Sequence, residues 1–417
     1  MKACGPPACG SRSRRVVSAD GVSRMLRRAC LAAIALLPWP AVGAESGSSP
    51  PTDAADTAPE PSGGRASFFD PSDGQFDISA MLEKPRGFLP IPVIITEPAV
   101  GYGGGLFGMF LRPREEAGSE GWSRPDISAI GGIGTENGTR AAFAGDSSLW
   151  FDGRLKTLAG IGSGRINLDF YGLGLDTSMP DDPVRYTLQF HGAIAQANWK
   201  LAPKSPWSIG MRYVYADVDP SLRETPAFPV VAENARVTVS APTAVLEYDS
   251  RDNLFTPLKG IYAETSLLAS REALGSTDAF QRFEQVLVGY WPLADRITLG
   301  ACGDYAHASD GTPFFLRPYI GLRGVPAMRY QGDQMASLEV EARWQFHGRW
   351  SLVAFGGGGR TWTERNAFST TQSVGSGGVG FRYEIASRFG LHVGMDVAHS
   401  DGTNAVYLQI GNAWFRP

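Results

Sequence analysis

The stretch Leu338-Glu-Val-Glu-Ala-Arg-Trp-Gln-Phe346 decides the fold. Its apolar residues fall on every second position, and Glu339, Glu341 and Arg343 stand between them. This period of two predicts a β-strand with one apolar face and one polar face. A soluble sandwich and a membrane barrel both use such strands, so the alternation alone leaves the two folds open.

The lengths of the connecting segments favour the membrane barrel. From Gly87 to Phe415, alternating segments of about 8 to 16 residues are joined by links that are short and long in turn. Outer-membrane barrels have tight periplasmic turns and longer extracellular loops, whereas a soluble sandwich has no reason to keep this order. We therefore predict an all-β fold, a transmembrane antiparallel β-barrel of about 16 strands that begins near Phe88. The turn at 113–125 and the last loop at 400–403 depart from this order. The short links are at 150–153, 201–205, 251–256, 293–295, 347–349 and 386–388, and the long ones at 168–183, 220–235, 271–279, 309–333 and 361–372.

Composition excludes several other classes of protein. The 417 residues are 43% hydrophobic and 19% charged. No apolar run reaches the roughly 18 to 20 residues of a membrane-spanning helix, which disfavours a helical membrane protein. The 51 glycines and 29 prolines suit many short strands joined by turns. The formal charge of −4 comes without a basic stripe, so we expect outer-membrane lipid, and not nucleic acid, as a partner.

The first residues have the three parts of a secretory signal. The arginines at 27–28 precede an apolar stretch at 29–37, and a small-residue site follows at Val42-Gly-Ala44. We therefore expect a signal peptide at residues 1–44 and a periplasmic or outer-membrane destination. The basic residues at the start indicate either a long leader or translation that begins at Met25.

Residues 45–86 are rich in Ser, Pro, Asp and Gly and have little to bury, so we expect a flexible, disordered periplasmic tail. The barrel then occupies residues 87–417. Within the tail, the spacing of Asp70, Asp73 and Asp77 is loosely similar to a calcium loop. The terminal Glu of such a loop is missing, so a turn is the better prediction.

The last strand carries a second indication of the outer membrane. In Asn404 to Phe415, Ile410 and Trp414 fall on one apolar face. Gln409, Gly411 and Trp414 fit a polar-x-Gly-x-x-aromatic pattern. This pattern resembles the terminal insertion signal of outer-membrane proteins. The resemblance implies that the outer-membrane assembly machinery inserts this chain.

Five short motifs between residues 237 and 415 resemble those of the outer-membrane protein assembly superfamily, to which BamA and TamA belong. Their order and spacing are more specific than any single motif. The resemblance implies a 16-stranded barrel and a loop, here 309–333, that folds into its lumen. The motifs are Asp249-Ser-Arg-Asp-Asn253 with Pro257-Leu-Lys-Gly260, Leu322-Arg-Gly-Val325, Glu341-Ala-Arg343, Gly378-Val-Gly-Phe-Arg382 and Asp396-Val-Ala398.

The resemblance makes Arg323, Gly324 and Val325 the lumen-loop motif. In the family, the loop arginine contacts acidic groups on the inner wall. A desolvated guanidinium needs such partners, whereas a solvated loop arginine, the other interpretation of Arg323, does not.

The usual partner of this arginine is an Asp in a Phe-x-Asp-like motif on the thirteenth strand. Here that strand reads Phe355-Gly-Gly-Gly-Gly359, and the Asp is absent. By alternation, the nearest lumen-facing candidates are Glu339, Glu341 and Asp396. We expect one or more of them to pair with Arg323.

Pro90 and Pro92 stand in the first alternating segment. Inside a strand, they would remove about two hydrogen-bond donors along one edge. If that edge faces the last strand, the boundary between the first and last strands is weak and can open. The equally open alternative places both prolines in the turn before the strand.

Catalytic or cofactor chemistry is not expected. The glycine runs at 101–105 and 356–359 lack the strand, helix and Lys of a phosphate loop. His392 and His399 fall on opposite faces of one strand, so a shared metal is not expected. We therefore predict a protein that is not an enzyme and has no cofactor or metal.

Two functions stay open at this point. The resemblance implies a barrel that assists insertion or translocation of outer-membrane or secreted polypeptides. The family's known insertases carry periplasmic POTRA domains, and the span from Ala44 to Gly87 is too short for one. The resemblance therefore implies a reduced member, and capture of substrate from the periplasm is in doubt. The alternative is a passive barrel, either a small-solute pore or a surface antigen.

Overall fold

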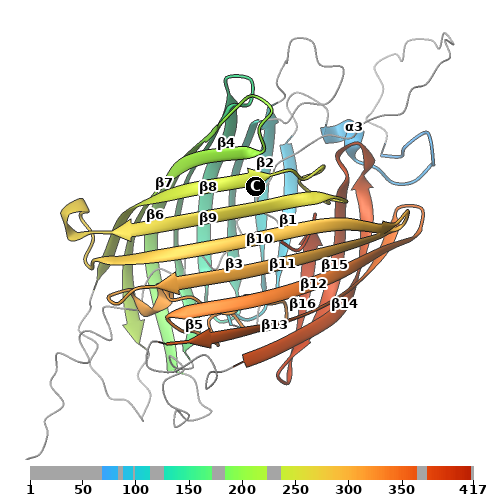
Figure 1. Ribbon diagram of the computed structural model, residues 1–417. Coiled ribbons are helices and arrows are strands. Elements are labelled where there is room, and N and C mark those ends of the chain that lie inside the picture. Colours follow the sequence, from blue (N-terminus) through green and yellow to red (C-terminus); the bar gives the residue numbers. More distant parts are fainter. Residues whose placement is uncertain are drawn as a thin grey trace, which may run out of the picture.

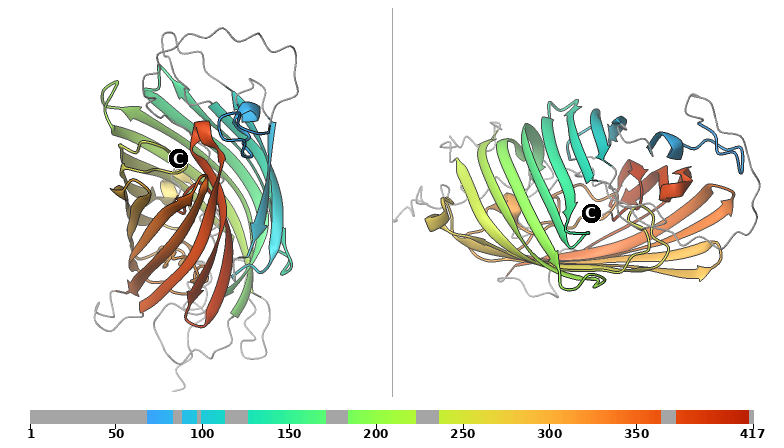
Figure 2. Two further views of the ribbon diagram at one scale, coloured as in Figure 1. Left: turned by 90° about the vertical axis from the view of Figure 1, so that its right-hand side faces the viewer. Right: turned by 90° about the horizontal axis from the view of Figure 1, so that it is seen from above.

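The structure, a computed structural model, describes residues 68–82, 88–96, 99–112, 126–170, 184–222, 236–363 and 373–414. Sixteen strands form one sheet, in which each strand pairs with the next along the chain. The sheet curls until the first strands (blue) and the last strands (red) come together (Figures 1 and 2). The predicted antiparallel barrel of 16 strands is confirmed. The predicted signal peptide and residues 45–67 of the predicted tail lie outside the described residues.

The strands have 8 to 17 residues, and the longest cross the sheet obliquely. In its described part, the chain has no helix that is long and apolar enough to span a membrane. The elements in chain order are α3 (Ser79–Leu82), β1 (Phe88–Ile95), β2 (Gly103–Arg112), β3 (Asp126–Thr135), β4 (Arg140–Trp150), β5 (Leu155–Phe170), β6 (Val184–Lys200), β7 (Trp207–Leu222), β8 (Val237–Asp249), β9 (Gly260–Ser270), η1 (Glu272–Leu274), β10 (Phe280–Ala294), β11 (Ile297–Ala308), η2 (Phe314–Leu316), β12 (Gln334–His347), β13 (Trp350–Trp362), β14 (Ser373–Ala386), η4 (Ser387–Phe389), β15 (Leu391–Ser400) and β16 (Thr403–Ile410).

The alternation of β12 shows which face of the sheet looks outward. Leu338 and Trp344 are 54% and 50% exposed, whereas Glu339 and Glu341 are buried. The outer face is therefore apolar and the lumen contains the charged side chains, as in a barrel that lies in lipid. A sandwich would bury the apolar face instead, so the structure decides between the two folds that the alternation left open.

The long loop between β11 and β12 lies inside the barrel. Its residues Phe315 and Met328 are each 1% exposed and belong to one core cluster with Leu188 and Val218. Those two residues lie on β6 and β7, on the far wall. The predicted inward fold of the loop at 309–333 is therefore confirmed. We call this segment the lumen loop.

The strands β1 and β16 lie next to each other, but no ladder joins them within the described residues. We call this boundary the seam. Pro90 and Pro92 lie inside β1, which pairs with β2 without interruption over Phe88–Ile95. Because proline has no N–H, this ladder must use the odd-numbered residues of β1. Consistently, the Val93 carbonyl oxygen lies 3.2 Å from where a Cβ on Gly104 of β2 would stand. The edge with the two prolines therefore faces the seam.

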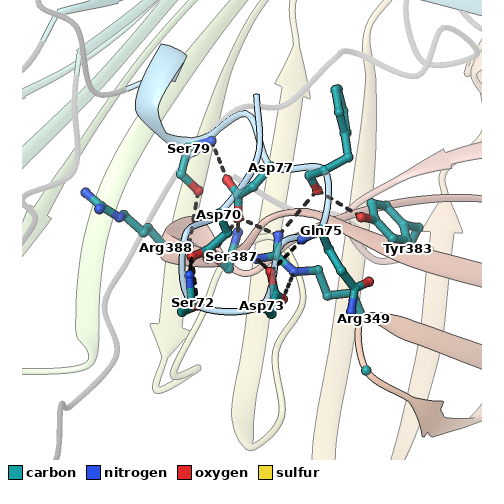
Figure 3. Close-up of polar contacts among 12 residues, drawn as sticks. Asp70, Ser72, Asp73, Gln75, Asp77, Ser79, Arg349, Tyr383, Ser387 and Arg388 are labelled. Carbon is teal, nitrogen blue, oxygen red and sulfur yellow. Dashed lines mark hydrogen bonds and ion pairs between the residues drawn. The ribbon is translucent and has the colours of Figure 1, made fainter. Parts of the chain in front are cut away.

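Residues 68–82 precede β1 and dock against the other side of the seam (Figure 3). The buried guanidinium of Arg349, in the turn between β12 and β13, donates to three carboxylates of this segment. Its distances are 2.7 Å to Asp70, 2.6 Å to Asp73 and 2.5 Å to Asp77. We call residues 68–82 the strap. They form part of the span in which a flexible tail was expected, and the described part of that span packs on the barrel.

Further hydrogen bonds attach the strap to β14 and η4. The Tyr383 hydroxyl donates to the Phe76 carbonyl at 2.9 Å, and the Ile78 amide donates to the Ile385 carbonyl at 2.9 Å. The amide and the hydroxyl of Ser387 both donate to Asp77. The chain then continues into β1, so the strap connects the two sides of the seam at the periplasmic end.

Candidate functional site

The lumen-loop motif is fixed by its backbone before any charge is considered. Gly324 has a φ of +91°, and a Cβ there would lie 3.1 Å from the Cβ of Ala398. The positive φ favours glycine, and the close approach leaves little room for a side chain. The Gly324 amide donates to the Tyr407 hydroxyl at 3.0 Å, while Val325 is buried and packs in a cluster with Leu322. This local geometry sets the direction in which the side chain of Arg323 leaves the loop.

The Arg323 guanidinium meets all three candidate carboxylates. Nε donates to both oxygens of Glu339 at 3.1 and 3.2 Å. Nη1 donates to Glu341 and to Asp396, each at 2.8 Å. The guanidinium carbon lies 3.6 Å from the ring centre of Phe355, which gives a close cation–π contact. Arg323 is 8% exposed, so it is not a solvated loop charge in this structure.

Two more arginines complete the site. Arg382 donates to both oxygens of Asp396, at 2.6 and 2.9 Å. Arg343 donates to the Pro257 carbonyl at 2.7 Å. Three cations therefore balance three carboxylates, which offsets the large desolvation cost of burying each charge. We call this set the lumen cluster: Arg323, Glu339, Glu341, Arg343, Arg382 and Asp396.

The site also accounts for the missing Asp on β13. Counting from Phe355, that Asp would stand at Gly357, which pairs directly with Glu339 of β12. A Cβ at Gly357 would lie only 2.5 Å from the Leu338 carbonyl oxygen, so β13 has no room for a side chain there. The carboxylate comes from the facing residue of the neighbouring strand instead.

The terminal segment departs from its expected geometry. The last strand ends at Ile410, so Trp414 does not share its outward face. Gly411 has a φ of +77°, and its amide donates to the His392 carbonyl at 2.7 Å, which turns the chain inward. The Trp414 indole then donates to Glu339 at 2.6 Å and packs against Tyr290. Trp414 is therefore a further hydrogen-bond donor to the lumen cluster. The alternation did not predict this contact, because it assumed an uninterrupted strand.

The remaining residue of the proposed insertion signal, Gln409, lies on β16 and pairs with Gly394 of β15. The signal at Gln409, Gly411 and Trp414 remains a prediction. Trp414 lies between Tyr290 of the wall and Glu339 of the lumen cluster.

The turn between β8 and β9 contacts the lumen cluster through the Pro257 carbonyl, which accepts from Arg343. Arg251 is paired with Asp249 at 2.7 Å and stacks 4.4 Å from the Tyr262 ring centre. Asn253 accepts from two backbone amides of the turn and donates to the Phe389 carbonyl at 2.9 Å. The turn thus contacts η4, which also holds the strap.

The lumen cluster joins the lumen loop to the barrel wall through ion pairs. Each carboxylate is occupied by a guanidinium, and the cluster ties the lumen loop to β12, β14 and β15. In the described ranges, no group of three or more His, Cys, Asp and Glu is placed to hold a metal ion. The arrangement braces one wall of the barrel, the wall that leads to β16.

Comparison with protein-family profiles and with curated proteins finds no match to this chain. Solved structures do match. BamA from Haemophilus ducreyi lacking POTRA domains 1–3 superposes with a TM-score of 0.52 and 12% identity, covering 78% of this chain and 69% of that one. CdiB from Escherichia coli gives a TM-score of 0.57 and 11% identity, over 79% and 62% of the two chains. This chain has the fold of the BamA and CdiB barrels.

A third structure agrees with this assignment. CdiB from Acinetobacter baumannii gives a TM-score of 0.53 and 10% identity, and the match covers 78% of this chain and 59% of that one. The expected resemblance is confirmed at the level of the fold: the chain forms a 16-stranded barrel like those of BamA and CdiB. It spans 59% to 69% of the length of these three structures.

Proposed function

We propose that this BamA-type barrel assists the insertion or translocation of polypeptides at the outer membrane by opening its seam. The observation that carries the proposal is the proline edge of β1, which faces β16 without a ladder. A strand edge without partners is a template for pairing with another strand. An incoming polypeptide would add its first strand at the facing edge of β16, which has no ladder partner among the described strands.

The energetic argument compares the seam with the other boundaries of the sheet. A backbone hydrogen bond contributes a net of about 0.5 to 1.5 kcal/mol, and Pro90 and Pro92 each remove one donor. The seam therefore loses about 1 to 3 kcal/mol relative to a boundary with the same geometry and no proline. β16 still carries its own donors, so a substrate strand without proline would pair there more strongly than β1 does.

The rest of the structure suits a barrel that opens at one boundary only. On the β16 side, the lumen cluster cross-links β12, β14 and β15 to the lumen loop. On the β1 side, Leu82 of the strap is joined to Phe88 by six peptide units, which reach at most about 21 Å. The ion pairs of the lumen cluster hold β12, β14 and β15 and do not include β1, so we expect β1 to be the side that moves.

The test is a disulfide across the seam. Ile94 on β1 is changed to Cys together with Cys at Asn404, Val406 or Leu408 on β16, all positions on the outward face. The purified protein is placed in liposomes, and the insertion of a urea-unfolded outer-membrane barrel is followed with and without reductant. We expect the unmodified barrel to accelerate insertion of the unfolded protein. The oxidised seam disulfide should abolish this acceleration, and its reduction should restore it.

A matched control uses a boundary that is already paired. Ile161 on β5 and Ala193 on β6 stand directly opposite each other, also on the outer face. Locking them with a disulfide should leave insertion unchanged. Equal activity of the oxidised seam and of this control would overturn the proposal.

The passive pore is less well supported. The lumen loop and its apolar contacts fill the space through which a solute would pass. A surface antigen without transport predicts that the seam disulfide changes nothing, so the same experiment separates the two functions.

A further inference from the structure

Two arginines face each other on the outer, lipid-facing surface near the seam. Arg140 of β4 and Arg165 of β5 are directly paired across the ladder, and both are exposed. They lie on the same face as Ile161, which is 63% exposed. Asp146, on the same outer face of β4, is paired with Arg112, whereas the two arginines face each other, and this arrangement requires a specific explanation.

The height of the two arginines on the barrel can be derived from the register. At the lower ends of the same strands, Trp150 pairs with Leu155, and Leu155 pairs with Trp199. The two tryptophans are 52% and 40% exposed and form part of an aromatic girdle at the periplasmic interface. The row of the arginines is ten residues farther along both strands.

Ten residues at about 3.3 Å each, tilted by about 40°, rise roughly 25 Å. That is about the height of the apolar band of an outer-membrane barrel. Arg140 and Arg165 therefore stand at the opposite interface, level with the headgroups of the outer leaflet.

The two like charges repel each other. Like charges directly opposite on an antiparallel pair are destabilising, because their Cβ atoms are only about 5 Å apart. Within the described residues, neither guanidinium makes an ion pair. One carboxylate, Glu136, lines the same hollow and accepts from the Tyr102 amide, so the lining carries two positive charges and one negative charge. By contrast, Asp217 near the same rim is paired with Arg236 at 2.5 Å.

The surface beside the arginines is open. A hollow of about 590 Å³ is lined by both arginines and by glycines at 103, 134 and 138. Gly134 pairs directly with Arg140, and Gly104 pairs with Gly134, so the row between the arginines and β1 carries no side chains. The bare backbone leaves room for a headgroup beside the two guanidinium groups.

We propose that Arg140 and Arg165 form a binding site for the phosphate of an outer-leaflet lipid headgroup, three strands from the seam. A guanidinium binds phosphate through paired, charge-assisted hydrogen bonds, and two of them would clamp one phosphate. The phosphate removes the repulsion between the two arginines. The acyl chains of the lipid would lie along the outer face of β4 and β5. Bound lipid would thus hold the wall beside β1 to the outer leaflet.

The test uses lipid A with two phosphates, added to the full chain in detergent and followed by native mass spectrometry. The first variant carries Arg140→Gln and Arg165→Gln, and the second carries Arg140→Lys and Arg165→Lys. A control with Lys200→Gln and Lys204→Gln removes two exposed charges at the periplasmic end. We expect the Gln pair to weaken lipid A binding at least tenfold, the Lys pair to weaken it less, and the control to leave it unchanged.

Thermal unfolding of the same samples provides a second measurement. Without lipid A, the Gln pair should be at least as stable as the unchanged chain, because the repulsion is gone. Addition of lipid A should raise the unfolding temperature of the unchanged chain and not that of the Gln pair. Equal binding by the Gln pair, an equal loss in the control, or equal binding of an uncharged diacylglycerol would each overturn the proposal. Displacement of lipid A by millimolar inorganic phosphate would show an anion site that is not selective for lipid, which also overturns it.

Discussion

Glu339 on β12 stands directly opposite Gly357 on β13, and it supplies the carboxylate for which β13 has no room. The loop arginine is therefore held by a side chain from the neighbouring strand. The ring of Phe355, also on β13, covers the guanidinium at 3.6 Å. Arg323 of the lumen loop therefore contacts a wall carboxylate although the thirteenth strand carries no acid at the expected position.

This relationship predicts that Gly357 tolerates no side chain. Gly357→Ala would place a Cβ 2.5 Å from the Leu338 carbonyl oxygen, and we expect a loss of about 1 to 3 kcal/mol in the free energy of unfolding. The control is Gly358→Ala on the outer face, where the nearest atom is 3.6 Å away. Urea titrations in detergent should separate the two variants, and equal stability would refute the crowding argument.

Loss of the loop arginine should weaken the whole barrel. Arg323→Ala leaves Glu339 and Glu341 without that cation in a buried site, which costs about 3 to 5 kcal/mol. The control is Arg329→Ala in the same loop, because its partner Asp401 is more than half exposed and such pairs contribute about 0 to 1 kcal/mol. Urea unfolding followed by tryptophan fluorescence measures both. A loss of similar size in the two variants would mean that the lumen cluster has no special role.

The strap should release at low pH. Burial alone would raise the pKa of Asp77, but hydrogen bonds from Ser387 and Ser79 outweigh it and hold that pKa well below its usual range. Because the pKa is lower in the docked state, docking is fully supported above the free value of about 3.9, and the support weakens progressively as the pH falls from there toward the much lower docked pKa. Between pH 7 and about pH 5, docking should not change.

A spin label at Ala80, introduced as Ala80→Cys in a chain with the native cysteines replaced by serine, reports on docking. The label should be immobile at pH 7, and its mobile fraction should begin to grow only below about pH 4 and should increase steadily at lower pH. Arg349→Gln should make it mobile at pH 7, whereas Arg296→Gln in another periplasmic turn should not. A label that stays immobile in Arg349→Gln would show that the hydrogen bonds to β14 suffice.

The lumen loop should decide conductance. In planar bilayers, we expect the unchanged chain to show no large steady conductance, because the loop fills the lumen. Replacement of residues 310–332 by a short Gly/Ser linker should open a large steady pore. A large steady pore in the unchanged chain would contradict the filled lumen and favour a passive function.

The sequence predicted the barrel well because the relevant signals are local. The period of two in Leu338–Phe346 needs only the strand itself, and the order of short and long links needs only lengths along the chain. Both signals can be read without any knowledge of tertiary contacts. The set of three carboxylates near Arg323 was likewise within reach, since alternation assigns each of them to the lumen face.

The contacts across the lumen were beyond such reasoning. Alternation offered three partners for Arg323 without saying that one guanidinium meets them all, and it placed Trp414 on the outer face. Trp414 turns inward because Gly411 adopts a positive φ and the strand ends at Ile410. A positive φ at one glycine has no signature that separates it from the many other glycines of the chain.

What the sequence by itself determined is the outer-membrane barrel, its strand order and the residues that line its lumen. Only the tertiary structure decided that the proline edge of β1 faces the seam, that Arg349 gathers the strap, and that Glu339 replaces an acid on β13. The physical reason is the same in each case. These contacts join residues far apart in the chain, and their distances depend on the curvature and register of the closed sheet, which no local pattern encodes.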